Sequence, residues 1–269
     1  MKTYHHTIFY PEERERLDEA TLGRSEEGTL KSLPSALLVP HAAYSMIGEA
    51  LHQTFSHAAS LKPELVVFLG PLHQPVLEQD APAFLFAPEA NTFEQAERTY
   101  RFDEAVIDEL TSCFPIRRAS YYYEEEPAFE LTLPFIDSYL KPKAILPLIG
   151  KIENSNQINQ SILSLKKIVQ RQPKSLFVLS ANASELLPQY EATDEANHFI
   201  EDLVHEYRSL GIRSSCNWGM LEAINRSALI GGRWKIASTF LKGIGYARIA
   251  DAKSESGLMT WHIGAYKGA

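Results

Sequence analysis

Three short apolar runs, each beside proline, glycine or polar residues, constrain the fold of this chain more than any other feature. They cover Ser35 to His41, Glu64 to His73 and Ser175 to Asn182, and a less regular run with an internal proline covers Lys143 to Gly150. Continuous apolar runs of this length are typical of strands that are buried on both faces of a parallel sheet. The sequence therefore predicts a mainly parallel central sheet.

Stretches with helical spacing alternate with these runs. We predict helices at Gly48 to His57, Phe102 to Cys113, Ser155 to Gln170 and Asp194 to Leu210, and a later one from about Trp218 to Ile230. Two late strands, Trp234 to Ala250 and Gly257 to Ala269, would extend the sheet as antiparallel edges. Because no linker or repeat divides the chain, we expect one α/β domain over residues 1–269, a three-layer α/β/α sandwich.

Composition excludes several classes of protein. The 269 residues are 45% hydrophobic, which argues against disorder, and the formal net charge of −8 without a basic run argues against a nucleic-acid partner. Cys113 and Cys216 are the only cysteines, too few for a disulfide framework. The N-terminus lacks the apolar core of a signal peptide, and no stretch approaches the roughly 20 apolar residues that span a bilayer. We expect a cytoplasmic protein without a membrane partner.

Two histidines follow two of the predicted strands. His41 ends the first apolar run and His73 ends the second, about one strand–helix–strand unit later. In open α/β sheets, ligands bind beyond the carboxyl ends of the strands, so both imidazoles could face one cleft. Imidazole is a common ligand for iron, copper and zinc, which makes this pair a candidate metal site. The alternative is that each histidine bonds a loop carbonyl and merely terminates its strand.

Further candidates lie outside the strand ends. Cys216 precedes a predicted helix whose N-terminal charge would favour a thiolate, either as ligand or as nucleophile, although most free cysteines are small buried residues. Glu130 is an acid in an apolar stretch and is a candidate catalytic base or a group that orients a histidine, with a capping or surface role as the alternative. We interpret the acidic run Glu124 to Glu126, beside three tyrosines, as a solvated turn.

Several segments resemble the motifs of Memo-like proteins, also called AmmeMemoRadiSam system protein B. PHAAYSMIGEAL is similar to the family's PHAGYxYSG, VVFLGPLHQ to (I/V)LGPSHH, EEPAFELTLPF to EHSIExxLPF, VLSANASELL to SSDxSHY and SSCNWGMLEAIN to xCGxxPIxxxL. The segments follow the family order along nearly the whole chain. The resemblance implies an α/β/α fold similar to class III extradiol dioxygenases, a site of three histidines with a nearby cysteine, and radical-SAM and AMMECR-type proteins as partners.

Carried over residue by residue, the resemblance assigns five positions. His41 and His73 match the first two histidines of the family site, and Cys216 matches its cysteine. Tyr44 matches the tyrosine of the first motif and is expected to line the ligand cleft, while Glu130 matches the acid of the ExxLPF block. The resemblance thus supports the candidates that the strand ends had already selected.

The chain also departs from the family pattern. We place Ala181 at the aspartate of SSDxSHY and Ser184 at its third histidine, so Ser184 would line the cleft as a poor substitute ligand. Pro127 replaces the histidine of EHS. These losses favour a degenerate site in a scaffold that binds a small-molecule ligand or a protein partner. The alternative is a metal-dependent redox or dioxygenase-like enzyme that binds iron, copper or zinc through His41, His73 and Cys216.

Overall fold

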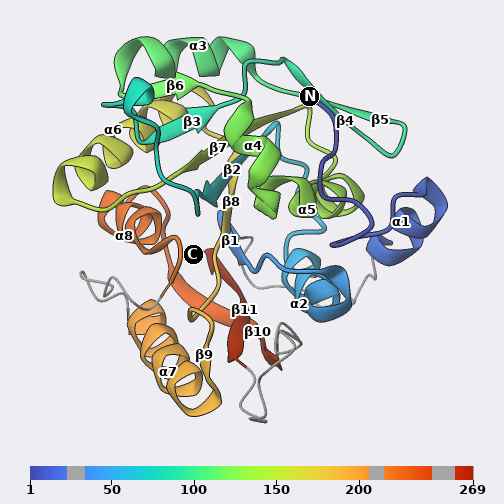
Figure 1. Ribbon diagram of the computed structural model, residues 1–269. Coiled ribbons are helices and arrows are strands. Elements are labelled where there is room, and N and C mark those ends of the chain that lie inside the picture. Colours follow the sequence, from blue (N-terminus) through green and yellow to red (C-terminus); the bar gives the residue numbers. More distant parts are fainter. Residues whose placement is uncertain (23–33, 206–214, 244–257, 269) are drawn as a thin grey trace.

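The structure is a computed structural model that describes residues 1–22, 34–205, 215–243 and 258–268 (Figure 1). Its main sheet has the strand order β10–β11–β1–β8–β2–β7–β3–β6, with β9 paired to β11. These strands are β1 (Ala36–Val39), β2 (Leu65–Pro71), β3 (Leu85–Ala87), β6 (Ile116–Arg118), β7 (Ala144–Gly150), β8 (Ser175–Ser180), β9 (Leu187–Pro188), β10 (Arg233–Gly243) and β11 (Leu258–Gly268).

The four central strands, β1, β8, β2 and β7, run parallel to one another. Every residue of β1 and β2 is buried, which explains why their sequences are continuous apolar runs rather than alternating ones. Both strands flank β8, and Val39 pairs with Ser180 while Leu69 pairs with Leu179. The segments that follow β1 and β2 therefore leave the sheet at the same edge. The prediction of a parallel core sheet is confirmed.

Antiparallel strands extend this core on both sides. β11 pairs antiparallel with β1 and with β10, as predicted for the C-terminal third, and β3 pairs antiparallel with β7. The sheet is therefore mixed, with parallel strands at its centre. Residues 244–250 of the predicted late strand lie outside the described residues.

Helices cover both faces of the sheet (Figure 1). α2 and α5 lie on one face, α6 and α8 on the other, α7 packs on β10 and β11, and α3 packs on β6. Their bounds are α1 (Arg14–Thr21), α2 (Tyr44–Ser56), α3 (Glu104–Cys113), α4 (Tyr121–Glu125), α5 (Pro127–Phe135), α6 (Ser155–Arg171), α7 (Gln189–His205) and α8 (Trp218–Ser227). The three-layer α/β/α prediction is confirmed. α7 begins before the predicted Asp194, and residues 206–210 of that predicted helix lie outside the described residues.

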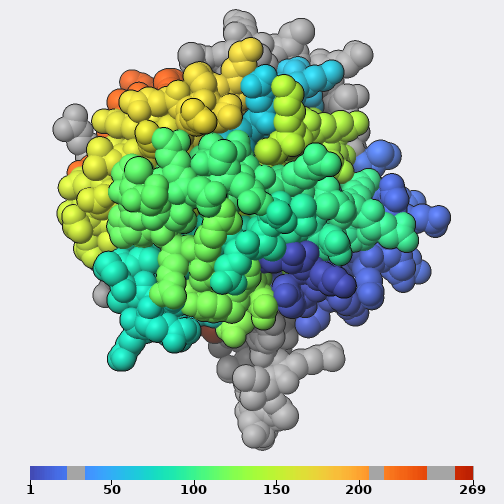
Figure 2. All heavy atoms as spheres, turned by 90° about the horizontal axis from the view of Figure 1, so that it is seen from above, coloured from blue at the N-terminus to red at the C-terminus, as the bar shows by residue number. Residues whose placement is uncertain are grey.

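The N-terminal segment packs against a separate hairpin formed by β4 (Thr92–Gln95) and β5 (Arg98–Arg101). The Met1 amino group donates to the Thr92 carbonyl at 2.8 Å, and the Glu94 N–H donates to the Met1 carbonyl at 2.8 Å. Figure 2 shows this segment in dark blue beside the hairpin. Among the helices in the described ranges, none is long and apolar enough to cross a membrane.

Candidate metal centre

The two predicted histidines meet at the carboxyl edge of the sheet. His41 follows β1 after one proline, and His73 follows β2 after Leu72. Because both strands pair in parallel with β8, their ends project to the same side, and the imidazole centroids lie 5.2 Å apart. His41 is buried, whereas the side chain of His73 is 49% exposed. One imidazole therefore forms the floor of the site and the other its open side.

Cys216 lies near the two histidines and belongs to the segment that leads into α8. It immediately precedes the N-cap of α8, and its Sγ lies 3.6 Å from His41 Nε2. One nitrogen from each histidine and the Cys216 sulfur all lie within 4.8 Å of one another. Three side chains of types that suit a transition metal thus converge on one point, as expected from the sequence for His41, His73 and Cys216. Their role as metal ligands stays a prediction.

Each histidine is oriented through its Nδ1 atom. His73 Nδ1 lies 2.6 Å from the Glu126 carboxylate, and His41 Nδ1 lies 2.9 Å from Ser180 Oγ. An imidazole that donates from Nδ1 keeps the lone pair of Nε2 available to a metal, and such partners fix both the tautomer and the ring orientation. The hydrogen bonds of the two Nδ1 atoms thus leave the two Nε2 atoms as the candidate ligand atoms.

Asn182 fixes the backbone around the cluster. Its side chain donates to the His41 carbonyl at 3.3 Å and accepts from the His41 N–H at 3.3 Å, while its own N–H donates to Cys216 Sγ at 3.3 Å. His262, on β11, contacts the same Asn182 Oδ1 through Nδ1 at 3.1 Å. One residue after β8 thus connects the β1 loop, the segment before α8 and β11, and it fixes His41 and Cys216 relative to each other.

The two histidines differ in their electrostatics. Burial, together with the charges of His73 and His262, holds the pKa of His41 well below its usual range, so His41 is neutral. Burial also opposes charge on His73, but its hydrogen bonds with Cys216 and Glu126 outweigh that effect and raise the pKa of His73 to about 10. A metal that binds here must displace the His73 proton, since only the deprotonated nitrogen is a ligand.

A cavity of about 290 Å³ opens over the exposed side of the cluster. His73 and Cys216 contribute to its wall, together with the rim residues Lys151 and Glu153 and the aromatic side chain of Trp218. This volume is near the small end of the usual range for ligand pockets, about 300 to 1,000 Å³. A metal held by the three side chains would therefore be open to a small ligand from this cavity.

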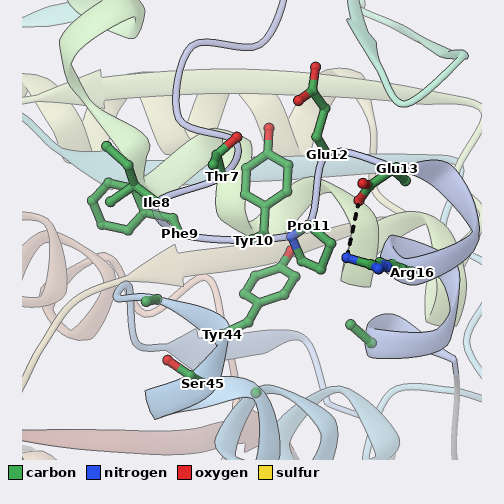
Figure 3. A pocket seen from close by; sticks show the side chains of 13 residues that line it. Thr7, Ile8, Phe9, Tyr10, Pro11, Glu12, Glu13, Arg16, Tyr44 and Ser45 are labelled. Carbon is green, nitrogen blue, oxygen red and sulfur yellow. Dashed lines mark ion pairs between the residues drawn. The ribbon is translucent and has the colours of Figure 1, made fainter.

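The other predicted site residues lie elsewhere. Tyr44 donates from its hydroxyl to the Leu131 carbonyl at 2.6 Å and lines a different cavity, of about 650 Å³, formed with the N-terminal segment (Figure 3). Glu130 is buried beneath that segment, where it accepts hydrogen bonds from the backbone N–H groups of Tyr4 and His5 and from the Tyr10 hydroxyl. Neither residue lines the cavity beside His73 and Cys216.

Ser184 is also turned away from the cluster. Its Oγ accepts the Trp261 N–H at 3.1 Å and lies 3.3 Å from Thr260 Oγ1, and the next residue, Glu185, lines the cavity instead. Counting from Ser180 as the first serine of SSDxSHY puts Asn182 at the aspartate and Glu185 at the histidine. The positions assigned above to Ala181 and Ser184 are thus one residue too early for the side chains that lie near the site.

Sequence reasoning missed Glu126. We interpreted the acidic run as a solvated turn, and this holds for the exposed Glu124 and Glu125, but Glu126 is 1% exposed and bonds His73. It is the N-cap of α5, where it accepts the Ala128 N–H at 3.2 Å. The Glu-Pro pair at Glu126 and Pro127 is a helix-start signal that could have placed it at a structured position.

Comparisons with known proteins agree with this architecture. A family model described as Memo-like protein matches residues 3–213, a range that contains both histidines and ends just before Cys216. A MEMO1 family protein of Aquifex aeolicus strain VF5 is 25% identical over 186 residues, which are 68% of this chain and 67% of that protein. The crystal structure of an uncharacterized Escherichia coli K12 protein superposes with a TM-score of 0.50 at 9% identity, over 85% of this chain and 98% of that one, and supports the fold alone.

Proposed function

We propose that this chain, which belongs to the Memo-like protein family, binds one transition-metal ion through His41, His73 and Cys216 and offers the ion's remaining coordination position to a small ligand in the adjoining cavity. The observation that carries the proposal is the convergence of the three ligand atoms within 4.8 Å. A catalytic metal site commonly has three protein ligands and an open fourth position.

The residues fit a soft or borderline metal. Two imidazoles and a thiolate suit zinc, copper or iron, whereas magnesium and calcium prefer oxygen ligands. When bound, such an ion would supply Lewis acidity to a ligand, and copper or iron would add a one-electron couple. The protein contributes the rest: Glu126 and Ser180 orient the imidazoles, and the buried His41 side excludes water from the floor of the site.

The supports that surround the ligands favour a working site over a degenerate scaffold. Glu126 caps α5, and in addition it bonds the ring of His73, which is the kind of carboxylate partner that metal-binding histidines usually have. Glu126 is 1% exposed and bonds the His73 ring at 2.6 Å. We therefore favour the hypothesis of a metal-dependent protein over the hypothesis of a degenerate scaffold, which the sequence alone had favoured.

Metal analysis of protein purified without chelator or affinity-tag metal tests the proposal. We expect about one zinc, copper or iron per chain in the wild type, and a loss of that metal in His41→Ala, His73→Ala and Cys216→Ser. His198→Ala is the matched control, since His198 is exposed on α7 and its ring lies 3.8 Å from Asp194. Equal metal content in all of these proteins, or none in any of them after incubation with each metal, would contradict the proposal.

A narrower proposal concerns reaction and partners. The resemblance to AmmeMemoRadiSam system protein B and to class III extradiol dioxygenases supports a redox or dioxygenase-like activity and an association with radical-SAM and AMMECR-type proteins. The cavity beside His73 favours a small substrate over a polymer. Oxygen uptake by the iron-loaded protein with small phenolic substrates, and co-purification with both partner types, test the two parts separately.

A further inference from the structure

Glu185 stands out on the wall of the cavity that contains His73 and Cys216. It is exposed, and its carboxylate has no hydrogen-bond or ion-pair partner among the described residues. The other carboxylate on this wall, Glu153, pairs with Lys151 at 3.2 Å. Among the described residues of the cavity wall, Glu185 is therefore a carboxylate that no hydrogen bond or ion pair holds in place.

The backbone around Glu185 is fixed although its side chain is not. The preceding residue, Ser184, accepts the Trp261 N–H at 3.1 Å on its Oγ and the Thr260 hydroxyl at 2.7 Å on its carbonyl. In addition, the Ala183 N–H donates to the Trp261 carbonyl at 3.0 Å. These bonds to β11 fix the backbone beside Glu185, whose side chain lines the same cavity as His73 and Cys216.

The three-ligand cluster has a coordination deficit that Glu185 can fill. Zinc and related ions are usually four-coordinate in such sites, and among the described residues the cluster of ligand atoms within 4.8 Å consists of His41, His73 and Cys216. A carboxylate tethered on the wall of the same cavity has a high effective concentration there, so it would compete well with water for the fourth position. A small external ligand that enters the cavity must then compete with the carboxylate.

We infer that Glu185 is a fourth protein ligand, which occupies the cavity-facing position of the metal at rest and leaves that position when a small external donor binds. This inference rests on the proposed function. Removing the Glu185 carboxylate should then have two separate effects. The protein should hold the metal less tightly, and an external donor such as imidazole should bind the metal-loaded site more tightly. A residue that only supported the fold would not produce both.

Titration with Co²⁺ against a competing chelator tests the first effect. We expect Glu185→Ala and Glu185→Gln to weaken Co²⁺ binding by about tenfold or more, in the range seen when a single support of a metal site is lost. Glu185→Asp, shorter by one methylene, keeps the charge but not the reach and is expected to be weakened as well. Because Glu185 is exposed, these variants should fold normally. Glu153→Gln removes one negative charge from the same cavity and should bind like the wild type.

Imidazole titration of the Co²⁺-loaded proteins, followed by visible absorption, tests the second effect. We expect half-saturation at a lower imidazole concentration in Glu185→Ala than in the wild type or in Glu153→Gln. If the Glu185 variants match the wild type in both titrations while His41→Ala loses Co²⁺, the inference is wrong and the proposed function stands. An equal loss in Glu153→Gln would overturn it in favour of a general charge effect, and a wild type that binds no Co²⁺ would refute both proposals.

Discussion

Replacing Glu130 with glutamine should destabilise the protein without affecting metal binding. Glu130 is 1% exposed, and four donors converge on its carboxylate: the N–H groups of Tyr4 and His5, both at 2.9 Å, His5 Nδ1 at 3.2 Å, and the Tyr10 hydroxyl. Glutamine is nearly the same size, but its amide group points two N–H donors at these donors. The change therefore removes acceptors rather than volume.

The magnitude follows from the number of bonds lost. A hydrogen bond to a charged group contributes about 1.5–3 kcal/mol, and glutamine retains one of the two oxygen acceptors. Allowing for relaxation of the N-terminal segment, we expect the free energy of unfolding to fall by about 2–4 kcal/mol, since breaking a buried charged pair costs about 3–5 kcal/mol. At roughly 2–4 °C per kcal/mol for a chain of this size, Tm should fall by about 5–15 °C.

Urea unfolding at neutral pH measures this loss, with Glu124→Gln as control. Glu124 is exposed and accepts one bond, from the Tyr4 hydroxyl at 3.2 Å, so its substitution should change the free energy of unfolding by less than about 0.5 kcal/mol. Metal content of Glu130→Gln should match the wild type. Unchanged stability together with lost metal binding would refute this reasoning and return Glu130 to the catalytic role that the sequence suggested.

The same network predicts the pH dependence of the effect. Burial opposes ionisation of Glu130, but hydrogen bonds from His5, Tyr10 and the Tyr4 backbone outweigh it and lower the pKa of the carboxyl. A group with a lowered pKa stabilises the fold above its unfolded pKa, about 4.3 for glutamate, and loses that contribution as the pH falls through its folded pKa. The stability difference between wild type and Glu130→Gln should therefore be constant near neutrality and shrink progressively below about pH 4.3.

Three further variants test how the ligands are held. Glu126→Gln should keep the protein folded but weaken metal affinity by about 10- to 100-fold, measured by chelator competition, because the His73 ring loses its charged partner at 2.6 Å. Gly219→Ala should lower the free energy of unfolding in urea by about 1–3 kcal/mol and weaken metal binding. The new Cβ would lie 2.4 Å from the Ile152 carbonyl oxygen, so α8, and with it Cys216, would have to shift. The control Gly48→Ala, in an open helix position of α2, should instead raise the free energy of unfolding by about 0.5–1 kcal/mol. Ser184→His should destabilise the protein without tightening metal binding, even with Ala181→Asp, because Ser184 is 4% exposed and bonded to β11; a gain in affinity would mean that its side chain turns toward the cluster.

The parts of the site that sequence reasoning found are those that strand order determines. His41 and His73 end two buried apolar runs, and any parallel sheet brings such ends to one edge, so their proximity required no knowledge of side-chain contacts. The same logic correctly gave the antiparallel extension by β11 and β10. Cys216 was found because it precedes a helix with a clear apolar pattern. In each case a local signal and the layer architecture sufficed.

The parts that sequence reasoning missed depend on single-residue register and on burial. The sequence suggests that Glu126 is one of three solvated acids. In the structure the helix that starts at Pro127 turns Glu126 inward, while Glu124 and Glu125 stay exposed. The sequence suggests that Glu130 is a catalytic residue in an apolar stretch. Its carboxylate instead accepts hydrogen bonds from the N-terminal segment, which is 120 or more residues away in sequence. Contacts of such separation leave no periodic trace in either segment.

In the loop after β8, the function assigned to the site depends on which residue is matched to the family's third histidine. If Ser184 is placed at the family's third histidine, the cluster lacks a side chain that metals prefer, and the sequence favours a degenerate scaffold. In the structure, hydrogen bonds to β11 hold Ala183 and Ser184 and turn Ser184 away, so the next side chain, a carboxylate, lines the cavity. A shift of one residue places at the cavity a carboxylate, which metals bind more readily than a hydroxyl. The case for a metal-dependent function therefore depends on the β11 contacts of this loop as much as on the histidines themselves.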